Sequence, residues 1–317
     1  MKKAFTLVEL IFVMVVLAII AGVGTDILRS LFDNYAVTAQ IHRLESVANN
    51  AADMIATRLE KRVPQTTAIE TSTDTGAKNY EPLSAIDAKN GKLVFFRKAY
   101  ELERNFISAK NGGVEAPRIS GFINDLKTTT TGDNGNFTDK VEFTSKETDL
   151  ADLKLDEYEL FFSNDSSLLY ENKDAPFDRY YKNSGKSFAY HCANGELKFQ
   201  AGKFTLTRSG CPASTSPAST SDIIIRPSMA ALIHKYYLSK EIDKIYLDTN
   251  KNLYLETCNI TGEKCKKSLL ATGVSTFRFS ALGSDPNIAS TIVFKLCLVE
   301  NEGKDNEAEA CQSRIVR

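Results

Sequence analysis

Oxygen-bearing side chains alternate along one short segment, and this spacing could hold a hard cation. Asp248, Asn250 and Asn252 are separated by single residues, so their oxygens could converge on one calcium ion. An EF-hand calcium loop would continue with a glycine and close on a glutamate, but this chain has Leu253 and Asn259 at those positions. The three residues are therefore a calcium candidate, with a tight turn as the simpler interpretation. We expect no other cofactor.

The cysteines are the second group that could do chemistry. All six lie in the C-terminal part of the chain: Cys192, Cys211, Cys258, Cys265, Cys297 and Cys311. An even, clustered set is typical of disulfides formed outside the cytosol. Pairing in chain order would close short loops, although the sequence leaves other connectivities open. Metal binding by His191 and Cys192 with Cys211, or by Cys258 with Cys265, is the less favoured alternative, because neither spacing matches a zinc ribbon.

The motifs of common enzymes are incomplete in this chain. The Gly-Lys-Ser triplet at 185–187 resembles the end of a phosphate-binding loop, but Tyr180 stands where that loop requires a glycine. The histidines, His42, His191 and His234, are far apart in sequence, and no serine or cysteine lies in a known nucleophile motif. We therefore predict that the protein is not an enzyme.

Charge is balanced along the chain as a whole. The sequence has 39 basic and 40 acidic residues and a formal net charge of -1, so composition gives no sign of a polyanionic partner. The densest basic cluster consists of Lys264, Lys266 and Lys267. This cluster could contact DNA, and a solvated loop beside Cys265 is the simpler interpretation.

The most informative charged residue is Glu9, which interrupts an apolar stretch that runs from Phe5 to about Gly24. A stretch of about 20 residues can span a bilayer core as a helix, and Lys2 and Lys3 before it should stay cytoplasmic. A mid-membrane carboxylate costs roughly 2.5–3.5 kcal/mol on the insertion scale. We therefore expect Glu9 to have a specific reason for its position near the start of the helix.

The helical pattern continues beyond this apolar stretch. Apolar or small residues recur every three or four positions at Ile27, Leu31, Tyr35, Thr38, Ile41, Leu44, Ala48, Ala51, Ile55 and Leu59. No proline occurs before Pro64, so we predict one helix over 5–62, roughly 85 Å long at about 1.5 Å per residue. Its half at 25–62 must leave the membrane and needs a domain over its apolar face. A cleaved signal peptide or a plain uncleaved anchor is the alternative.

The segment 3–10, Lys-Ala-Phe-Thr-Leu-Val-Glu-Leu, resembles the class III signal of type IV prepilins and type II secretion pseudopilins. The resemblance implies that a prepilin peptidase cuts between Ala4 and Phe5, removes the leader at 1–4 and methylates the new amine of Phe5. It also implies that Glu9 pairs with the N-terminal amine of a neighbouring subunit in the fibre. The family usually has glycine where this chain has Ala4.

Residues 63–317 are predicted to form one α+β domain. Short apolar runs between turn residues predict strands at 92–97, 140–144, 158–163, 187–191, 196–207, 223–225, 244–247, 253–257, 274–280 and 291–299. The turn at 248–252 makes a hairpin of the strands beside it, and 229–240 predicts a short helix. Composition predicts loops at 66–76, 128–136 and 212–222.

The predicted architecture is pilin-like, with a long N-terminal membrane-spanning helix packed on a β-rich periplasmic domain. The segment 5–24 is its transmembrane half and 25–62 its amphipathic half. The resemblance implies a single-pass protein of the inner membrane whose C-terminal domain, with its cysteine-rich part, lies in the periplasm. It implies other pilin or pseudopilin subunits, prepilin peptidase and the inner-membrane assembly platform as partners, with secreted cargo or DNA as further candidates.

Major pilins are usually much smaller than this chain, so the resemblance indicates a minor subunit, similar to the large J-like pseudopilins and their pilus counterparts. Such a subunit would help to initiate or cap a fibre used for protein secretion, DNA uptake or adhesion. A fibre-tip binding module, either an adhesin or a DNA receptor, is the alternative function. A plain membrane-anchored periplasmic protein is the third possibility.

Overall fold

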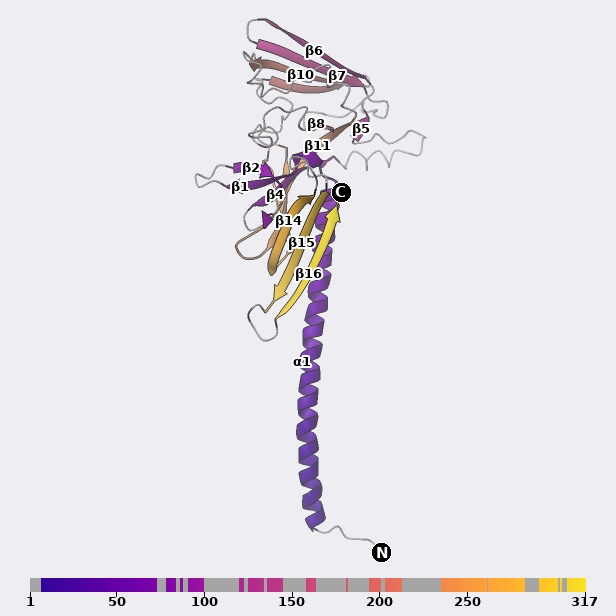
Figure 1. Cartoon of the computed structure of the whole chain (residues 1–317), viewed down its shortest axis with the longest axis vertical. Coiled ribbons are helices and arrows are strands. Elements are labelled where there is room, and N and C mark those ends of the chain that lie inside the picture. Colours follow the sequence, from indigo (N-terminus) through magenta and orange to yellow (C-terminus); the bar gives the residue numbers. More distant parts are fainter. Residues whose placement is uncertain are drawn as a thin grey trace, which may run out of the picture.

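The structure is a computed structural model of the chain. It describes residues 7–72, 78–83, 86–87, 91–99, 120–122, 125–133, 136–144, 158–163, 181, 194–200, 203–212, 235–260, 262–282, 291–301, 303 and 307–317. One long helix and three antiparallel sheets account for most of these residues. The α+β class that we predicted, with a long N-terminal helix before a β-rich domain, is confirmed (Figure 1).

Helix α1 (Leu7–Glu60) runs without a break and forms the stalk in Figure 1. Its 54 residues correspond to about 81 Å at about 1.5 Å per residue, in agreement with the helix predicted over 5–62. A short 3-10 helix, η1 (Pro64–Thr66), follows. Pro64 begins it, at a position where the missing N–H of proline costs little.

The largest sheet, sheet A, has eight strands from both halves of the chain. Six of them lie in the order β13-β12-β11-β4-β1-β2, and β5 and β8 pair with the first part of β11. Their bounds are β1 (Ala68–Ser72), β2 (Lys78–Pro82), β4 (Lys92–Lys98), β5 (Ser120–Phe122), β8 (Glu159–Ser163), β11 (Lys235–Leu247), β12 (Leu253–Asn259) and β13 (Lys266–Ala271). The neighbours β4 and β11 are therefore far apart in sequence.

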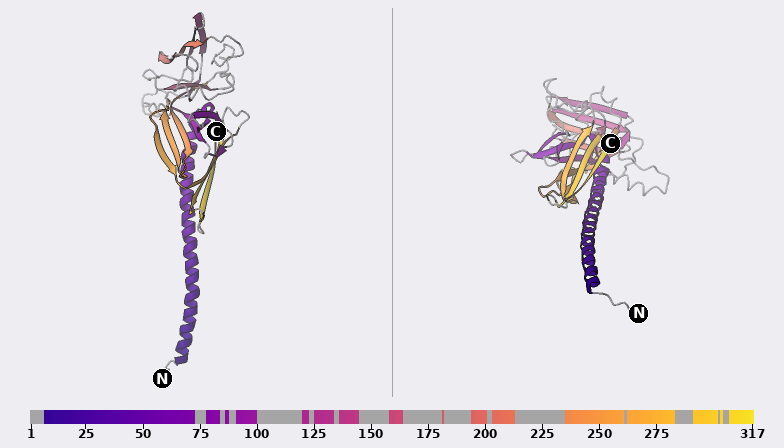
Figure 2. Two further views of the ribbon diagram at one scale, coloured as in Figure 1. Left: turned by 90° about the vertical axis from the view of Figure 1, so that its left-hand side faces the viewer. Right: turned by 60° about the horizontal axis from the view of Figure 1, so that its bottom comes forward.

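A second sheet, sheet B, lies along the domain end of α1 (Figures 1 and 2). Its order is β16-β15-β14-β3. The bounds are β3 (Ile86–Asp87), β14 (Val274–Leu282), β15 (Thr291–Glu300) and β16 (Ala308–Val316). Strands β15 and β16 contact the helix directly, so the C-terminal hairpin is the part of the domain that holds the stalk.

A third sheet, sheet C, lies at the end of the molecule farthest from the N-terminus (Figure 1). Its order is β6-β7-β10-β9. The bounds are β6 (Asp125–Asp133), β7 (Asn136–Thr144), β9 (Asn194–Gln200) and β10 (Lys203–Pro212). All four strands fall between β4 and β11 in sequence, so sheet C belongs to an insertion into sheet A. The Ala99 N–H donates to the Leu238 carbonyl at 2.9 Å where this insertion leaves the sheet.

Two apolar clusters lie on opposite faces of sheet A. The larger is enclosed by α1, sheet B and one face of sheet A, and its helix members are Leu44, Ala48, Ala51, Ala52, Ile55 and Leu59. Ala48 and Ala52 are fully buried, and their small side chains let the helix approach the sheets closely. The smaller cluster, on the other face of sheet A, includes Val63, Val94 and Phe161. The helix is thus fixed to the domain only along its C-terminal part.

One predicted element is wrong. The segment 229–240 was expected to be a short helix, but its described part begins strand β11 (Lys235–Leu247). Tyr236 and Leu238 are buried, and their backbone pairs with β8. Pairing and burial in a sheet override the helix propensity of a segment rich in Ala and Leu. Residues 229–234 lie outside the described residues.

Three other predictions placed boundaries incorrectly. The expected single strand at 196–207 is the hairpin of β9 and β10, the expected loop at 128–136 is mostly the hairpin of β6 and β7, and the loop at 66–76 contains β1. A run of β-branched threonines from Thr128 to Thr131 suits a strand, which explains the second error. The remaining predicted strands are confirmed, except those at 187–191 and 223–225, which lie outside the described residues, as does 213–222.

Candidate functional site: the exposed N-terminal helix

The first part of α1 is uncovered by the rest of the chain. Nearly all its large apolar side chains are exposed: Leu7, Val8, Leu10, Ile11, Phe12, Val13, Met14, Val15, Val16, Leu17, Ile19, Ile20 and Val23. Glu9 lies in the first turn of the helix and is itself exposed within this apolar surface. Ala4 and Phe5 lie outside the described residues. Of the three predicted site positions, the assembly carboxylate Glu9 is therefore the one that the structure describes, and it lies at the free end of the helix.

This segment has the length and composition of a membrane span. Its most apolar window of 18 residues has a mean hydropathy of 2.8, and none of it is buried in the domain. The uncovered part of α1 reaches to about residue 39 and is about 50 Å long at about 1.5 Å per residue. A bilayer core of about 30 Å leaves the part around Leu31 and Tyr35 uncovered by either lipid or domain.

The amphipathic face predicted from sequence is divided in the structure. Its members from Leu44 onward are buried against the sheets, and Ile41 is packed at the edge of that cluster. Ile27, Leu31, Tyr35 and Thr38 stay exposed. The expectation that a domain covers this face is therefore correct only for the part of the helix beyond about residue 40.

Polar contacts with sheet B fix the helix along the covered part. Arg314 on β16 lies beside two helix residues, with its Nη2 atom 3.0 Å from the Asp53 carboxylate and 3.1 Å from the Asn49 side-chain oxygen. Farther down the helix, Arg43 forms an ion pair with Glu300 at the end of β15. These contacts join the stalk to both strands of the C-terminal hairpin.

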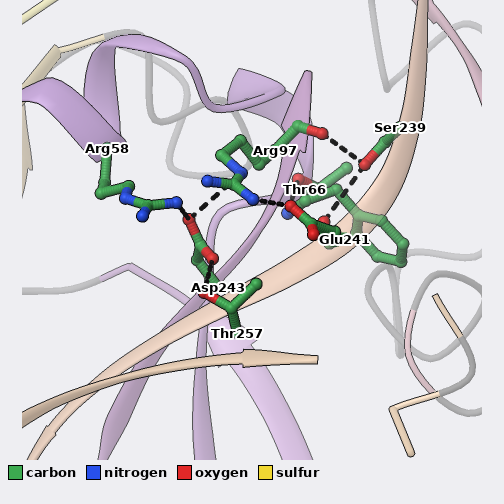
Figure 3. A network of polar contacts seen from close by, with 8 residues as sticks. Arg58, Thr66, Arg97, Ser239, Glu241, Asp243 and Thr257 are labelled. Atoms are coloured by element: carbon green, nitrogen blue, oxygen red, sulfur yellow. Dashed lines mark hydrogen bonds and ion pairs between the residues drawn. The ribbon is translucent and has the colours of Figure 1, made fainter. Parts of the chain in front are cut away.

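A buried ion network joins the end of α1 to sheet A (Figure 3). The Asp243 carboxylate, which is fully buried, lies 3.7 Å from Arg58 Nη1 and 3.6 Å from Arg97 Nε, and it accepts a hydrogen bond of 2.7 Å from Thr257. Burial raises the pKa of Asp243, although the Thr257 hydrogen bond and the charge of Arg58 oppose this. Arg97 also pairs with Glu241.

We did not predict this network from the sequence, although a signal was available. Asp243 and Ile245 are two positions apart on β11, so both side chains lie on the same buried face of the strand. An apolar residue is the norm at such a position. Such a carboxylate requires partners. Its partners Arg58 and Arg97 come from distant parts of the sequence, so only the fold identifies them.

Two of the predicted disulfides are present in chain order. Cys258 pairs with Cys265 across the β12–β13 connection, and Cys297 pairs with Cys311 across β15 and β16. The second crosslink joins the two strands that hold the helix. The expected third pair, Cys192 with Cys211, lies outside the described side chains.

The calcium candidate residues form a turn that is capped by one of them. Asp248 Oδ1 accepts hydrogen bonds from the backbone N–H groups of Asn252 at 2.8 Å and Asn250 at 2.9 Å, and Oδ2 accepts one from Asn252 Nδ2 at 3.1 Å. These hydrogen bonds lower the pKa of Asp248, and the one from the Asn252 backbone N–H contributes most. The turn joins β11 to β12. The carboxylate is thus used within the turn, and calcium binding there stays a prediction.

The structure does not bring the basic cluster and the histidines together among the described residues. Lys264, Lys266 and Lys267 are exposed, but Lys266 and Lys267 begin strand β13 rather than lying in the expected loop. His42 is exposed on α1, 3.4 Å from Glu45. The other two histidines and the Gly-Lys-Ser triplet at 185–187 lie outside the described residues.

The comparisons with known proteins concern the same end of the chain. A family model described as the prokaryotic N-terminal methylation motif matches residues 1–25. No curated protein and no solved structure matches the chain. The matched motif implies interaction with other pilin subunits and with prepilin peptidase, and it indicates a structural protein anchored in a membrane. With its class III signal and the long apolar helix that follows, the chain fits the family of type IV pilins and pseudopilins.

Proposed function

We propose that this chain is a minor structural subunit of a type II secretion pseudopilus or a type IV pilus. The observation that carries the proposal is the methylation motif at the start of a helix whose apolar segment to about Gly24 is uncovered. An exposed apolar surface of this size needs a partner. Lipid would cover it before assembly, and the helices of other subunits would cover it in the fibre.

In the proposed mechanism the inner membrane holds the precursor with the β-rich domain in the periplasm. Prepilin peptidase cuts between Ala4 and Phe5 and methylates Phe5, which gives the chain a cationic N-terminal amine. The exposure of Glu9 near the start of α1 supports its pairing with the amine of a neighbouring subunit. A charge pair in an apolar layer is tolerated where an isolated charge is not, so the pair would set the axial register of the two helices.

The part of the helix just beyond the membrane extends this model. Ile27, Leu31 and Tyr35 continue the apolar surface but have no cover within the described part of the chain. We assign them to packing against other subunits on the inner-membrane assembly platform. The size of the chain supports a role in few copies, as a subunit that initiates or caps the fibre.

The first test replaces Glu9 by alanine in the native host. We expect the variant to be processed and inserted normally but to be absent from sheared fibres or from crosslinks with other pilins. Protein secretion or DNA uptake should fall with it. Glu60→Ala is the matched control, because Glu60 is an exposed carboxylate of the same helix outside the apolar segment. Normal assembly together with normal secretion and uptake in the Glu9 variant would refute the proposal.

Mass spectrometry of the N-terminal peptide tests the processing step directly. The expected mature chain begins at Phe5 with a methylated amine. A chain that begins at Met1, or one cut beyond Glu9, would instead support a plain membrane anchor or a secreted protein.

The second candidate function is a binding module at the tip of the fibre. The observation that favours it is the position of sheet C, which is inserted between β4 and β11 and lies farthest from the N-terminus (Figure 1). Surface substitutions in the domain distinguish the two functions. Loss of adhesion or DNA binding with normal fibres would support the binding module, whereas loss of the fibres would support the structural role.

A further inference from the structure

One face of sheet A carries a row of tyrosine and charged side chains that crosses six strands. The register pairs Glu70 on β1 with Tyr80 on β2 and with Lys92 on β4, and it pairs Tyr246 on β11 with Tyr254 on β12. Neighbouring positions on these strands, such as Leu93 and Ile245, belong to the cluster against α1. Because side chains alternate along a strand, the row lies on the face turned away from the helix.

Lysines lie over the tyrosine rings of this row. The Nζ atom of Lys92 is 4.6 Å from the centre of the Tyr246 ring, and that of Lys267 on β13 is 3.6 Å from the Tyr254 ring and 5.3 Å from the Tyr246 ring. The two ring centres are 5.9 Å apart. Lys267 is exposed and both tyrosines are partly exposed, so the row reaches the surface of the domain.

The row carries both lysines and carboxylates. The buried carboxylate of Glu70 is neutralised by Lys244, whose Nζ atom is 2.8 Å from Oε2. Lys92 is a second cation on the same carboxylate, with its Nζ atom 3.7 Å from Oε1. The acids near Lys267 are Glu256, opposite it on β12, and Asp248, whose oxygens accept hydrogen bonds within its own turn. Lys92 and Lys267 thus place one cation on either side of the paired rings, each opposite a glutamate of the neighbouring strand.

We propose that this face, formed by Lys92, Tyr246, Tyr254 and Lys267, binds single-stranded nucleic acid. Phosphate groups would contact the two lysines, and successive bases would stack on the two rings, as they do on other sheet surfaces and grooves that combine cations with aromatic side chains. When Lys267 binds a phosphate, its side chain would move away from the Tyr254 ring. The site lies outside the helix that carries assembly, so it does not depend on the proposed structural role.

The combination of groups selects this ligand over two related ones. A duplex offers phosphates but keeps its base faces stacked inside, so the tyrosines would contribute little. An acidic polysaccharide offers charge without planar aromatic rings. Leu269, which follows the row on β13 and is 54% exposed, adds apolar surface that suits a base rather than a sugar or a phosphate.

The test measures binding of fluorescent oligothymidylate to the full chain in nanodiscs of uncharged lipid. We compare Tyr246→Leu with Tyr254→Leu as one double variant, and Lys92→Gln with Lys267→Gln as another. Tyr246→Phe with Tyr254→Phe keeps both rings. Lys127→Gln with Lys295→Gln removes two exposed lysines of sheets C and B and matches the change in net charge. Circular dichroism and thermal unfolding check that each variant is folded.

We expect the leucine pair to weaken binding by about a hundredfold, about tenfold for each ring lost, and the phenylalanine pair to bind like the original chain. The glutamine pair on sheet A should weaken binding and reduce the salt slope by about 0.7 for each lost phosphate contact, whereas the pair on sheets B and C should change neither. Absent binding at low salt would overturn the proposal. Three other results would also overturn it: binding of the oligonucleotide that does not depend on the two rings, tighter binding of a duplex, or ring-dependent binding of an acidic polysaccharide instead.

Discussion

The two parts of α1 have the same periodicity but opposite surroundings. Ile55 and Ile27 both belong to the apolar face predicted from sequence, yet Ile55 is buried between the two sheets and Ile27 is exposed. The difference comes from sheet B, whose last two strands reach only part of the helix (Figure 1). Amphipathic periodicity thus identifies a face that needs a partner, but it does not tell whether that partner belongs to the same chain.

The largest expected effect comes from truncating the covered part of the helix. Ile55→Ala should lower the free energy of unfolding by about 2–5 kcal/mol, because it removes buried methylene groups and leaves a cavity. Ile27→Ala is the matched substitution in the uncovered part and should change it by less than about 0.5 kcal/mol. Denaturant unfolding of the full chain in detergent measures both. Equal effects of the two substitutions would contradict the division of the helix.

The crosslink in sheet B gives the next largest effect. Replacing Cys297 and Cys311 by serine should destabilise the chain by about 2–4 kcal/mol, because this disulfide constrains the two strands that hold the helix. The corresponding double variant of Cys258 and Cys265 is the control. Cys258 and Cys265 are separated by 7 positions, whereas Cys297 and Cys311 are separated by 14. Removing the Cys258–Cys265 disulfide should therefore lower the free energy of unfolding by less. The reverse order would show that the hairpin does not depend on its crosslink.

The ion network at the end of the helix should have an intermediate effect that depends on pH. Arg58→Met should cost about 1–3 kcal/mol near neutral pH, since it leaves buried Asp243 with one cation fewer. The folded-state pKa of Asp243 is above its unfolded value, so the protonated form is favoured on folding and stability falls as pH rises through the folded pKa.

Removing Arg58 raises the pKa of Asp243 further, because the charge of Arg58 lowers it in the original chain. The deficit of the variant should therefore shrink as pH falls toward the unfolded pKa of an aspartate, about 3.9. Unfolding curves of both chains across this range give the comparison. A deficit that stays constant with pH would mean that Arg58 acts through packing alone.

The smallest expected effect concerns the partly exposed contact between Arg314 and the helix. Arg314→Ala should cost at most about 1 kcal/mol, because ion pairs near the surface contribute little. Added salt should reduce this cost, because salt screens the ion pair in the original chain. A larger effect that salt does not change would assign Arg314 a packing role against α1.

The N-terminal half of the architecture could be predicted because its signals are local. The class III segment at 3–10 and the helix over 5–62 depend on residues within a few positions of one another. The helix expected at 229–240 failed because Tyr236 and Leu238 acquire partners on β8, which no local pattern shows. Likewise, Asp243 is stabilised by Arg58 and Arg97, whose proximity exists only after the sheet has formed.

The same limit applies to the row on sheet A. Lys267 was visible in sequence as part of a basic cluster, but its neighbours Tyr246 and Tyr254 were visible only as strand residues. The register of β11, β12 and β13 brings the three side chains together. A surface made from separate strands cannot be recognised until that register is known.

The pairing of β4 with β11 has a consequence for how the chain folds. These strands are adjacent in sheet A, although the whole insertion that contains sheet C separates them. Contacts between residues so distant in sequence are slow to form, because a long loop must close before they stabilise anything. In the proposed periplasmic location the chain would be exported from its N-terminus, and β4 with its apolar residues Phe95 and Phe96 would emerge well before its partner strand. The nascent domain would then need protection from aggregation until β11 had crossed the membrane as well.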